Sequence, residues 1–424
     1  MTDRLYYADA YLREFDAVVT RVGQRDGRTF VVLDRTAFYP TSGGQPFDLG
    51  ILVGDPERVA PQTEVGQPFQ TEVGRPFQGR LQVIDVVDDD REVAHVVDGD
   101  VHGLAPGQPV HGAIDWTRRF DHMQQHTGQH VLSAAIDRLF GAGTVSCHLG
   151  TESSTIDVSR ELTRGEIVSA EVDANRIVWD NHPVSIRYAS AEDAAKLPLR
   201  KESVREGTLR LVDIEHFDLS ACGGTHVATT GGIGVIAIGA TERFKGGQRI
   251  EFFCGGRALT KFRSMRDALS GAVRVLSVLP DELPEAIEKL QADARERQKA
   301  LVSLQQDLAR YRAEEFVAAA EPAAAGRLVA RAVDADAGGL KSLASAITSR
   351  PGHIAVLVST ARPVLVVVAR SEDVAVSAHQ IIKTLTETFG GRGGGKPDLA
   401  QAGGLDGEPE AILAAGRSLA LLPS

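Results

Sequence analysis

Two pairs of metal-type ligands in distant segments constrain the fold of this chain most strongly. HTGQH places His126 and His130 four residues apart, and CGGTH places Cys222 and His226 at the same spacing. Apolar residues recur every three or four positions near residues 115–140, which predicts a helix with both histidines on one face. Each pair alone is weak evidence. Together they supply three imidazoles and one thiolate, a donor set that suits Zn²⁺, so we expect the two segments to meet around one ion.

The role of such an ion is open at this stage. Four protein ligands ordinarily form a closed structural site. A catalytic ion would need an additional ligand, or it would order the substrate while other groups activate water. Thr127 follows His126, so the HExxH arrangement with its glutamate base is absent. We expect no special role for the other candidates: Cys147 and His148, whose side chains diverge on a strand, Cys254, His95, His102 and His111.

Two glycine-rich segments are candidate binding elements. FYPTSGGQPFDLG (38–50) has a turn signature, and its Thr41, Ser42 and Gln45 offer hydrogen bonds to a small polar substrate; an ordinary β-turn is the alternative. In GGRGGGKPDLAQAGG (390–404) the glycines expose backbone N–H groups, while Arg392 and Lys396 add charge that suits phosphate. No GK[ST] follows, so this is no Walker loop, and a flexible surface loop is the alternative.

Periodicity changes along the chain and indicates several domains. Short apolar runs separated by turns predict β-structure up to residue 110, and mixed α/β structure follows. In residues 257–326 an apolar stripe at heptad spacing predicts a helical hairpin or short coiled coil, which either packs on its own domain or forms a dimer seam. EPAAAG (321–326) reads as a linker. The duplicated QTEVGQPF and QTEVGRPF (62–77) read as a loop insertion.

Composition limits the class of partner and the compartment. The 424-residue chain has a net charge of −11, which excludes a polycation that coats nucleic acid but permits a local basic groove. Residues 327–424 hold ten Lys/Arg against nine Asp/Glu, so we expect polyanion binding at this end or in local patches. Three cysteines are too few for a disulfide framework, and no signal peptide or membrane-length apolar run is evident. We expect a cytoplasmic protein with no membrane partner.

Read in order, the motifs resemble one family. The segments that carry the resemblance are FYPTSGGQPFDLG, HTGQHVLSAA, SCHLG, LRLVDIEHFDLSACGGTHVATTGGIG, GGQRIEFFCGGRAL and GGRGGGKPDLAQAGG. They resemble the editing half of alanyl-tRNA synthetase and the freestanding AlaX-type editing proteins. The family's glycine motif often reads GGGQ, and here Ser42 replaces the first glycine. The chain begins directly at the editing region, so we expect a trans-acting deacylase rather than a complete synthetase.

The resemblance implies an α+β multidomain fold. It predicts an N-terminal β-barrel-like domain (1–110) that carries the glycine-rich motif, and an α/β zinc-binding editing domain (111–256). A helical connector (257–326) and a C-terminal α/β DHH-associated domain that binds tRNA (327–424) follow. A homodimer through the connector or the C-terminal domain is a further expectation.

The resemblance also implies substrate and site residues. The expected reaction is hydrolysis of tRNA(Ala) mischarged with serine, or with glycine, while Ala-tRNA(Ala) is spared. His126, His130, Cys222 and His226 would bind one Zn²⁺ ion. Thr41 is the expected contact to the serine hydroxyl, with Ser42, Gln45 and Gln129 as further contacts or water-positioning groups. Arg249, Arg392 and Lys396 are the expected tRNA contacts. The alternatives are an editing enzyme for another tRNA, such as Ser-tRNA(Thr), and a zinc-stabilised tRNA-binding module without catalysis.

Overall fold

The computed structural model describes residues 1–54, 77–201 and 207–422. The chain divides into two compact units, Met1–Leu269 and Ser270–Ser424. The four predicted domain boundaries stay predictions within this coarser division. The duplicated segment at 62–77 lies outside the described residues apart from its last position.

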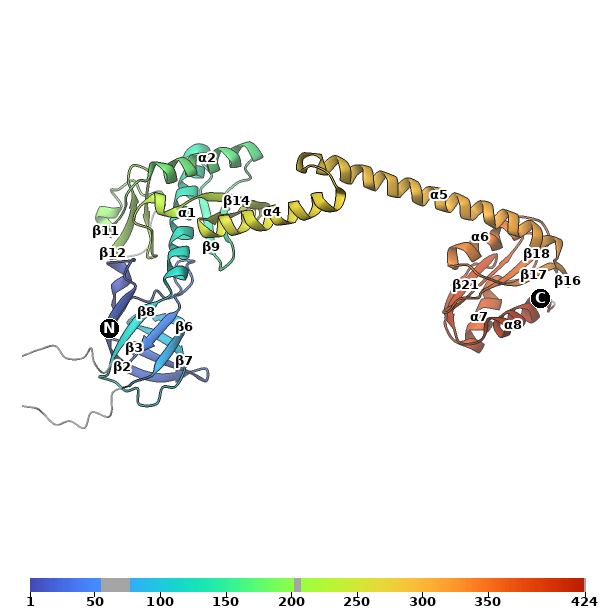
Figure 1. Cartoon of the computed structure of the whole chain (residues 1–424), viewed down its shortest axis with the longest axis horizontal. Coiled ribbons are helices and arrows are strands. Elements are labelled where there is room, and N and C mark those ends of the chain that lie inside the picture. Colours follow the sequence, from blue (N-terminus) through green and yellow to red (C-terminus); the bar gives the residue numbers. More distant parts are fainter. Residues whose placement is uncertain (55–76, 202–206, 423–424) are drawn as a thin grey trace, which may run out of the picture. The chain divides into compact units, whose positions relative to one another are not determined.

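The first unit opens with a closed six-stranded barrel, drawn in blue in Figure 1. Alternating side chains of its strands point inward, as Phe15, Ala17 and Val19 do on β2. Thus the predicted β domain is a true barrel, with no free sheet edge among its strands. In barrel order the strands are β2 (Glu14–Arg25), β3 (Arg28–Leu33), β7 (Glu92–Asp98), β6 (Arg80–Asp89), β5 (Gly50–Val53) and β8 (Pro109–Ile114). A short parallel pair, β1 (Asp3–Arg4) and β4 (Arg35–Thr36), accompanies the barrel together with the 3₁₀ turn η1 (Leu5–Tyr7).

Helix α1 (Trp116–Phe140) follows β8 and carries HTGQH, as predicted. The Asp115 side chain accepts from the Arg118 N–H and begins the helix, and Gly141 ends it with a φ of +61°. The middle of α1 is buried on all sides. Its apolar residues pack into a core that α1 shares with α2 (Arg164–Asp180) and with the antiparallel sheet formed by residues 144–158 and 236–254. These residues are Val131, Leu132, Ala135 and Ile136. A capping box of Thr163 and Glu166 opens α2.

Two antiparallel sheets complete this part of the first unit. One has the order β14 (Ile236–Phe244), β15 (Gly247–Cys254), β10 (Ser154–Val158) and β9 (Thr144–Leu149). The other has the order β11 (Val184–Ser190), β12 (Thr208–Ile214) and β13 (Asp218–Ala221), with the short helix α3 (Ala191–Ala194) after β11. CGGTH follows β13 directly, and η2 (Thr230–Ile233) lies beyond it.

The connector region consists of two helices, α4 (Gly256–Leu276) and α5 (Leu283–Ala318), with the 3₁₀ turn η3 (Pro280–Glu282) before α5. Near its end α5 buries Ala309 and Ala313 against the second unit's α6. Most of the predicted heptad stripe on α5 remains exposed in the single chain: Ile287, Leu290, Leu301, Leu304, Leu308 and Tyr311. Its use as a dimer seam stays a prediction.

The second unit contains a six-stranded sheet with helices on both faces (Figure 1). Its order is β16 (Glu321–Ala323), β17 (Gly326–Val333), β18 (His353–Ser359), β19 (Val364–Arg370), β21 (Leu399–Leu405) and β20 (Arg392–Gly395). Helix α6 (Ala337–Thr348) joins the parallel pair β17 and β18 and, with the end of α5, packs on one face. Helices α7 (Ala378–Phe389) and α8 (Pro409–Leu421) pack on the other face.

Two segments of this unit differ from their expected form. EPAAAG is not a linker, because Glu321–Ala323 forms β16 and pairs with β17 in a tight hairpin. GGRGGGK is not a free loop, because Arg392–Gly395 forms the edge strand β20 and pairs with β21. Glycine in the ladder permits close packing here: a Cβ on Gly393 would lie 2.4 Å from that of Ala402.

Within the described residues, no helix combines the length and the hydropathy that a membrane crossing requires.

Candidate metal centre

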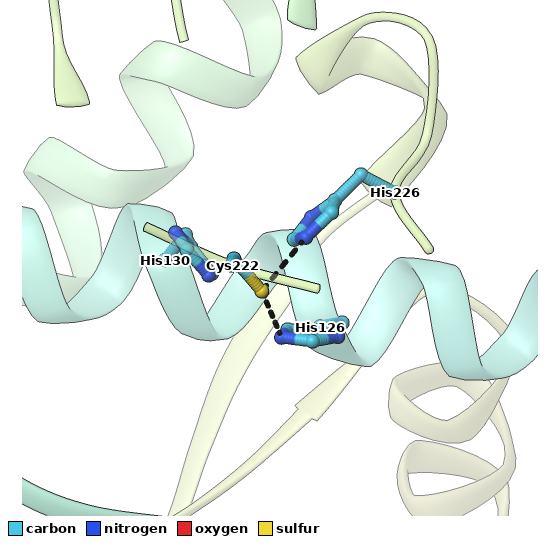
Figure 2. A group of neighbouring side chains, drawn as sticks. All are labelled: His126, His130, Cys222 and His226. Carbon is cyan, nitrogen blue, oxygen red and sulfur yellow. Dashed lines mark hydrogen bonds between the residues drawn. The ribbon is translucent and has the colours of Figure 1, made fainter. Parts of the chain in front are cut away.

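Helix α1 and the loop after β13 bring the four predicted ligands together (Figure 2). Their ligand atoms all lie within 4.8 Å of one another. The Cys222 Sγ is 3.2 Å from the His126 Nε2 and 3.4 Å from the His226 Nε2. The three histidines are buried and Cys222 is partly exposed. One sulfur and three imidazole nitrogens at this spacing fit a Zn²⁺ ion, because the donor set and the convergence match what the ion accepts.

The CGGTH loop reaches α1 closely because Gly224 has no side chain. A Cβ at this position would lie 2.1 Å from the His126 Cε1 and 2.3 Å from its Nδ1. Gly224 is not in the left-handed region, so the glycine serves space rather than backbone conformation. The Arg210 guanidinium donates to the carbonyl oxygens of Cys222 and Gly224, which fixes the course of the loop.

Each histidine ring uses its Nδ1 for a second partner. The His126 Nδ1 lies 2.9 Å from the Gln45 Oε1, the His130 Nδ1 lies 3.2 Å from the Asp218 Oδ2, and the His226 Nδ1 lies 3.2 Å from the Thr127 Oγ1. These contacts leave all three Nε2 atoms for the centre of the cluster. Partners of this kind orient metal-binding histidines and fix their tautomers.

Asp218 is held by further bonds that fix its carboxylate. The Arg200 Nε donates to its Oδ1 at 2.7 Å, and the Ser220 hydroxyl donates to its Oδ2 at 2.9 Å. Asp218 was not among the residues predicted from the sequence, although a signal was present. Asp218, Ser220 and Cys222 alternate along β13 and its continuation, so they point to the same side of the chain.

The protonation states of three of the four candidate ligands suit a metal site, whereas contacts with Asp218 and Cys222 raise the pKa of His130 despite its burial. Burial lowers the pKa of His126 to about 3, helped by the charge of Arg210. Burial also lowers the pKa of His226 well below its ordinary value. Burial opposes charge on Cys222 as well, but the hydrogen bond and charge of His130, the Gly224 N–H and the charge of Arg210 together outweigh this effect and lower the thiol pKa. Neutral imidazoles and a thiolate are the forms that bind metal.

The glycine-rich motif lies beside this cluster as a tight turn. Ser42 and Gln45 exchange backbone hydrogen bonds of 3.1 and 2.9 Å around Gly43 and Gly44, whose φ values are +58° and +87°. Gln45 is fully buried, Ser42 is partly exposed and Thr41 is exposed. At the base of the motif, Asp48 forms a fully buried ion pair with Arg119 of α1, with an Nε–Oδ1 distance of 3.0 Å.

The remaining predicted site residues are Gln129, Arg249, Arg392 and Lys396. Gln129 lies on α1 between the two histidines, and its amide donates to the Ser133 hydroxyl at 2.8 Å. Arg249 on β15 forms a two-bond pair with Asp157, at 2.7 and 3.0 Å, and stacks on Phe244. Within the described residues, Arg392 and Lys396 form no side-chain hydrogen bond or ion pair. Arg392 lines a pocket of about 290 Å³ with Gln401 and Leu365.

Known domain families match both units. Residues 209–251 match the threonyl and alanyl tRNA synthetase second additional domain, and this range includes Cys222 and His226. Residues 325–419 match the DHHA1 domain, which includes Arg392 and Lys396. An alanyl-tRNA editing protein, AlaX-L, from Pyrococcus horikoshii is 29% identical over 97% of this chain and 96% of its own length. The chain therefore carries matches to both domain families and is similar to this AlaX-L protein over nearly its whole length.

Longer proteins are similar to this chain over the same region. The alanine–tRNA ligases of Pyrococcus abyssi and Halobacterium salinarum are 33% and 35% identical to it over 94% and 96% of this chain. The chain spans 42% of the length of each. Among solved structures, the C-Ala domain of Aquifex aeolicus alanyl-tRNA synthetase aligns with 24% of this chain and 98% of that domain, at 20% identity and a TM-score of 0.23.

Proposed function

We propose that this chain hydrolyses the ester of tRNA(Ala) mischarged with serine, or with glycine, and spares Ala-tRNA(Ala). The observation that carries the proposal is a four-ligand cluster joined to the turn with Thr41 and Ser42, in a chain that aligns with AlaX-L over nearly its whole length. A zinc ion held by His126, His130, Cys222 and His226 would supply Lewis acidity or a fixed charge beside the ester.

Thr41 is the proposed contact to the serine side chain. Thr41 is exposed next to Ser42 on the glycine turn, where its hydroxyl can pair with the hydroxyl that distinguishes serine from alanine. If alanine entered instead, this polar group would lose its partner, so a site of this kind can discriminate strongly. Gln45 is the weaker candidate for substrate contact, because both ends of its buried amide are already bonded.

The second unit is proposed to bind the body of tRNA(Ala) through Arg392 and Lys396. Both lie at the edge strand β20, and neither is neutralised by a described partner. Free cations of this kind bind phosphate. Arg249 stays a weaker proposal, because Asp157 already pairs with its guanidinium. A homodimer through α5 or the second unit is also proposed, on the exposed apolar stripe of α5.

The test compares deacylation of Ser-tRNA(Ala), Gly-tRNA(Ala), Ala-tRNA(Ala) and Ser-tRNA(Thr) by zinc-loaded protein. We expect loss of serine from the first with alanine retained on the third. Cys222→Ala removes a proposed zinc ligand. Loss of a side chain that only orients a ligand typically reduces activity roughly 10–100-fold, so this variant should reduce the deacylation rate by more than that. Thr41→Val should reduce serine release while zinc binding is kept.

The other outcomes identify the competing functions. The closed four-ligand set also fits a structural ion. A folded, zinc-loaded chain that binds tRNA(Ala) but releases no amino acid would refute the proposed hydrolysis and favour a tRNA-binding module. Faster hydrolysis of Ser-tRNA(Thr) than of Ser-tRNA(Ala) would assign the enzyme to another tRNA.

A further inference from the structure

Gln45, Asp218 and Thr127 contact the Nδ1 atoms of the three histidines. Gln45 differs from the other two in the segment of the chain that supplies it. Thr127 lies on α1 next to the ligand His126, and Asp218 lies on β13 just before the ligand Cys222. Both therefore belong to the segments that supply the ligands. Gln45 comes from the glycine turn between β4 and the barrel strand β5, 81 residues before His126. It is the one partner of the three that joins the cluster to the turn with Thr41 and Ser42.

The amide of Gln45 has a single satisfactory orientation. Its Oε1 accepts from the His126 Nδ1 at 2.9 Å and from the Thr225 backbone N–H at 3.1 Å, while its Nε2 donates to the Thr225 Oγ1 at 2.8 Å. The side chain is fully buried, so water cannot replace a lost bond. A rotated amide would place its donor against the Thr225 N–H.

A metal ion on the His126 Nε2 requires the proton of the neutral ring to reside on Nδ1. Only that tautomer donates to Gln45. In the metal-free protein the ring can carry its proton on either nitrogen, and the tautomer with a bare Nδ1 would face the Gln45 Oε1 without a hydrogen. Metal loading therefore selects the ring state that holds Gln45 in place.

The position of Gln45 in turn sets the position of Ser42. The two residues exchange both backbone hydrogen bonds across Gly43 and Gly44, and the Tyr39 hydroxyl donates to the Ser42 carbonyl oxygen at 3.2 Å. Thr41 precedes Ser42 directly. A displacement at Gln45 therefore reaches the two proposed substrate contacts through one rigid turn.

We propose that Gln45 is a positioning residue that couples metal binding to the glycine turn, so that the turn with Thr41 and Ser42 is held more firmly when the ion is bound. This inference rests on the metal site of the proposed function but not on its substrate. Coupling is reciprocal, so the turn must also contribute to metal affinity.

The chain offers a matched control in Gln125. Like Gln45 it is a fully buried glutamine with both amide ends bonded, donating to the Cys254 carbonyl oxygen and accepting from the Cys254 N–H. Gln125 contacts none of the four ligands through its side chain. Gln125→Ala removes a comparable set of buried bonds, so it reports the general cost of such a loss. Gln45→Glu keeps an acceptor for the His126 Nδ1 and serves as the conservative variant.

The experiment is hydrogen exchange of the full chain with and without Zn²⁺, read in peptides that cover residues 38–49. In the wild type, Gln125→Ala and Gln45→Glu, we expect zinc to slow exchange of the Ser42 and Gln45 amides by about tenfold or more, within the usual range of coupling between sites. In Gln45→Ala the slowing should be absent. Peptides covering β6 and β7 (80–98) report whether the barrel itself stays folded.

Zinc affinity, measured by competition with a chromophoric chelator, is the second readout. Gln45→Ala should bind Zn²⁺ about 10–100-fold more weakly, and Gln45→Glu and Gln125→Ala should stay near the wild type. If zinc leaves exchange at 38–49 unchanged in the wild type, or if Gln45→Ala matches the wild type in both readouts, the coupling is overturned. A chain that shows the coupling but releases no amino acid would support this inference and reject the proposed hydrolysis.

Discussion

Gly223 and Gly224 are neighbours in CGGTH but have different roles. Neither residue has a positive φ, so neither is needed for a left-handed turn. A Cβ on Gly224 would overlap the His126 ring, whereas the nearest atom to a Cβ on Gly223 is the Tyr7 hydroxyl at 3.8 Å, an ordinary contact. Gly224 is thus required because the His126 imidazole occupies the space that a side chain at this position would fill.

Gly224→Ala should therefore displace His126 and weaken Zn²⁺ binding at least about tenfold, since a shift of a ligand costs no less than loss of its outer partner. Gly223→Ala is the control and should bind zinc like the wild type. The measurement is zinc content after dialysis together with chelator competition. Equal affinity of the two variants would contradict the role assigned to Gly224.

At the scale of elements, the barrel is stabilised by a buried neutral histidine that the sequence marked as unremarkable. His95 on β7 is fully buried; its Nδ1 donates to the Val31 carbonyl oxygen and its Nε2 accepts from the Thr36 hydroxyl. Burial lowers the pKa of His95 to about 4 from its ordinary 6.5. The unfolded chain thus takes up the proton first as the pH falls.

Stability contributed by neutral His95 is present above pH 6.5 and is lost as the pH falls toward 4. Between pH 7 and pH 5 this loss amounts to about 2 kcal/mol, from the proton-binding difference between the two states. The free energy of unfolding by urea, measured for the wild type and for His95→Gln at both pH values, isolates the contribution of His95. The variant should lose about 2 kcal/mol less than the wild type over this interval, and identical losses would exclude His95 as the cause.

At the scale of the whole molecule, the proposed function places hydrolysis in the first unit and tRNA binding in the second. The acidic chain has no general attraction for nucleic acid, so binding must rely on local cations such as Arg392 and Lys396. Such contacts tether the substrate and raise the local concentration of its acceptor end. Their loss should affect full-length tRNA more than a short acceptor fragment.

We expect the double variant Arg392→Gln, Lys396→Gln to raise KM for Ser-tRNA(Ala) and to leave kcat unchanged. Deacylation of a serine-charged acceptor minihelix should stay at the wild-type rate. Each lost phosphate contact should reduce the slope of log affinity against log salt by about 1. Lys383→Gln is the control. Lys383 lies on α7, which packs with α8 on the face of the second unit's sheet opposite to α6. Equal effects on the minihelix would mean that these cations act on the catalytic site or on folding.

The sequence by itself indicated the four candidate ligands, the helix that carries HTGQH and the resemblance to alanyl-tRNA synthetases and AlaX-type editing proteins. These features are local, because spacing on a helix and the types of donor atom can be read without a fold. Only the tertiary structure decided that Gln45 meets His126, that Asp218 orients His130 and that Gly224 supplies space for a ring. Those contacts depend on side chains from separate strands and loops reaching one point, and no periodicity in the chain encodes that convergence.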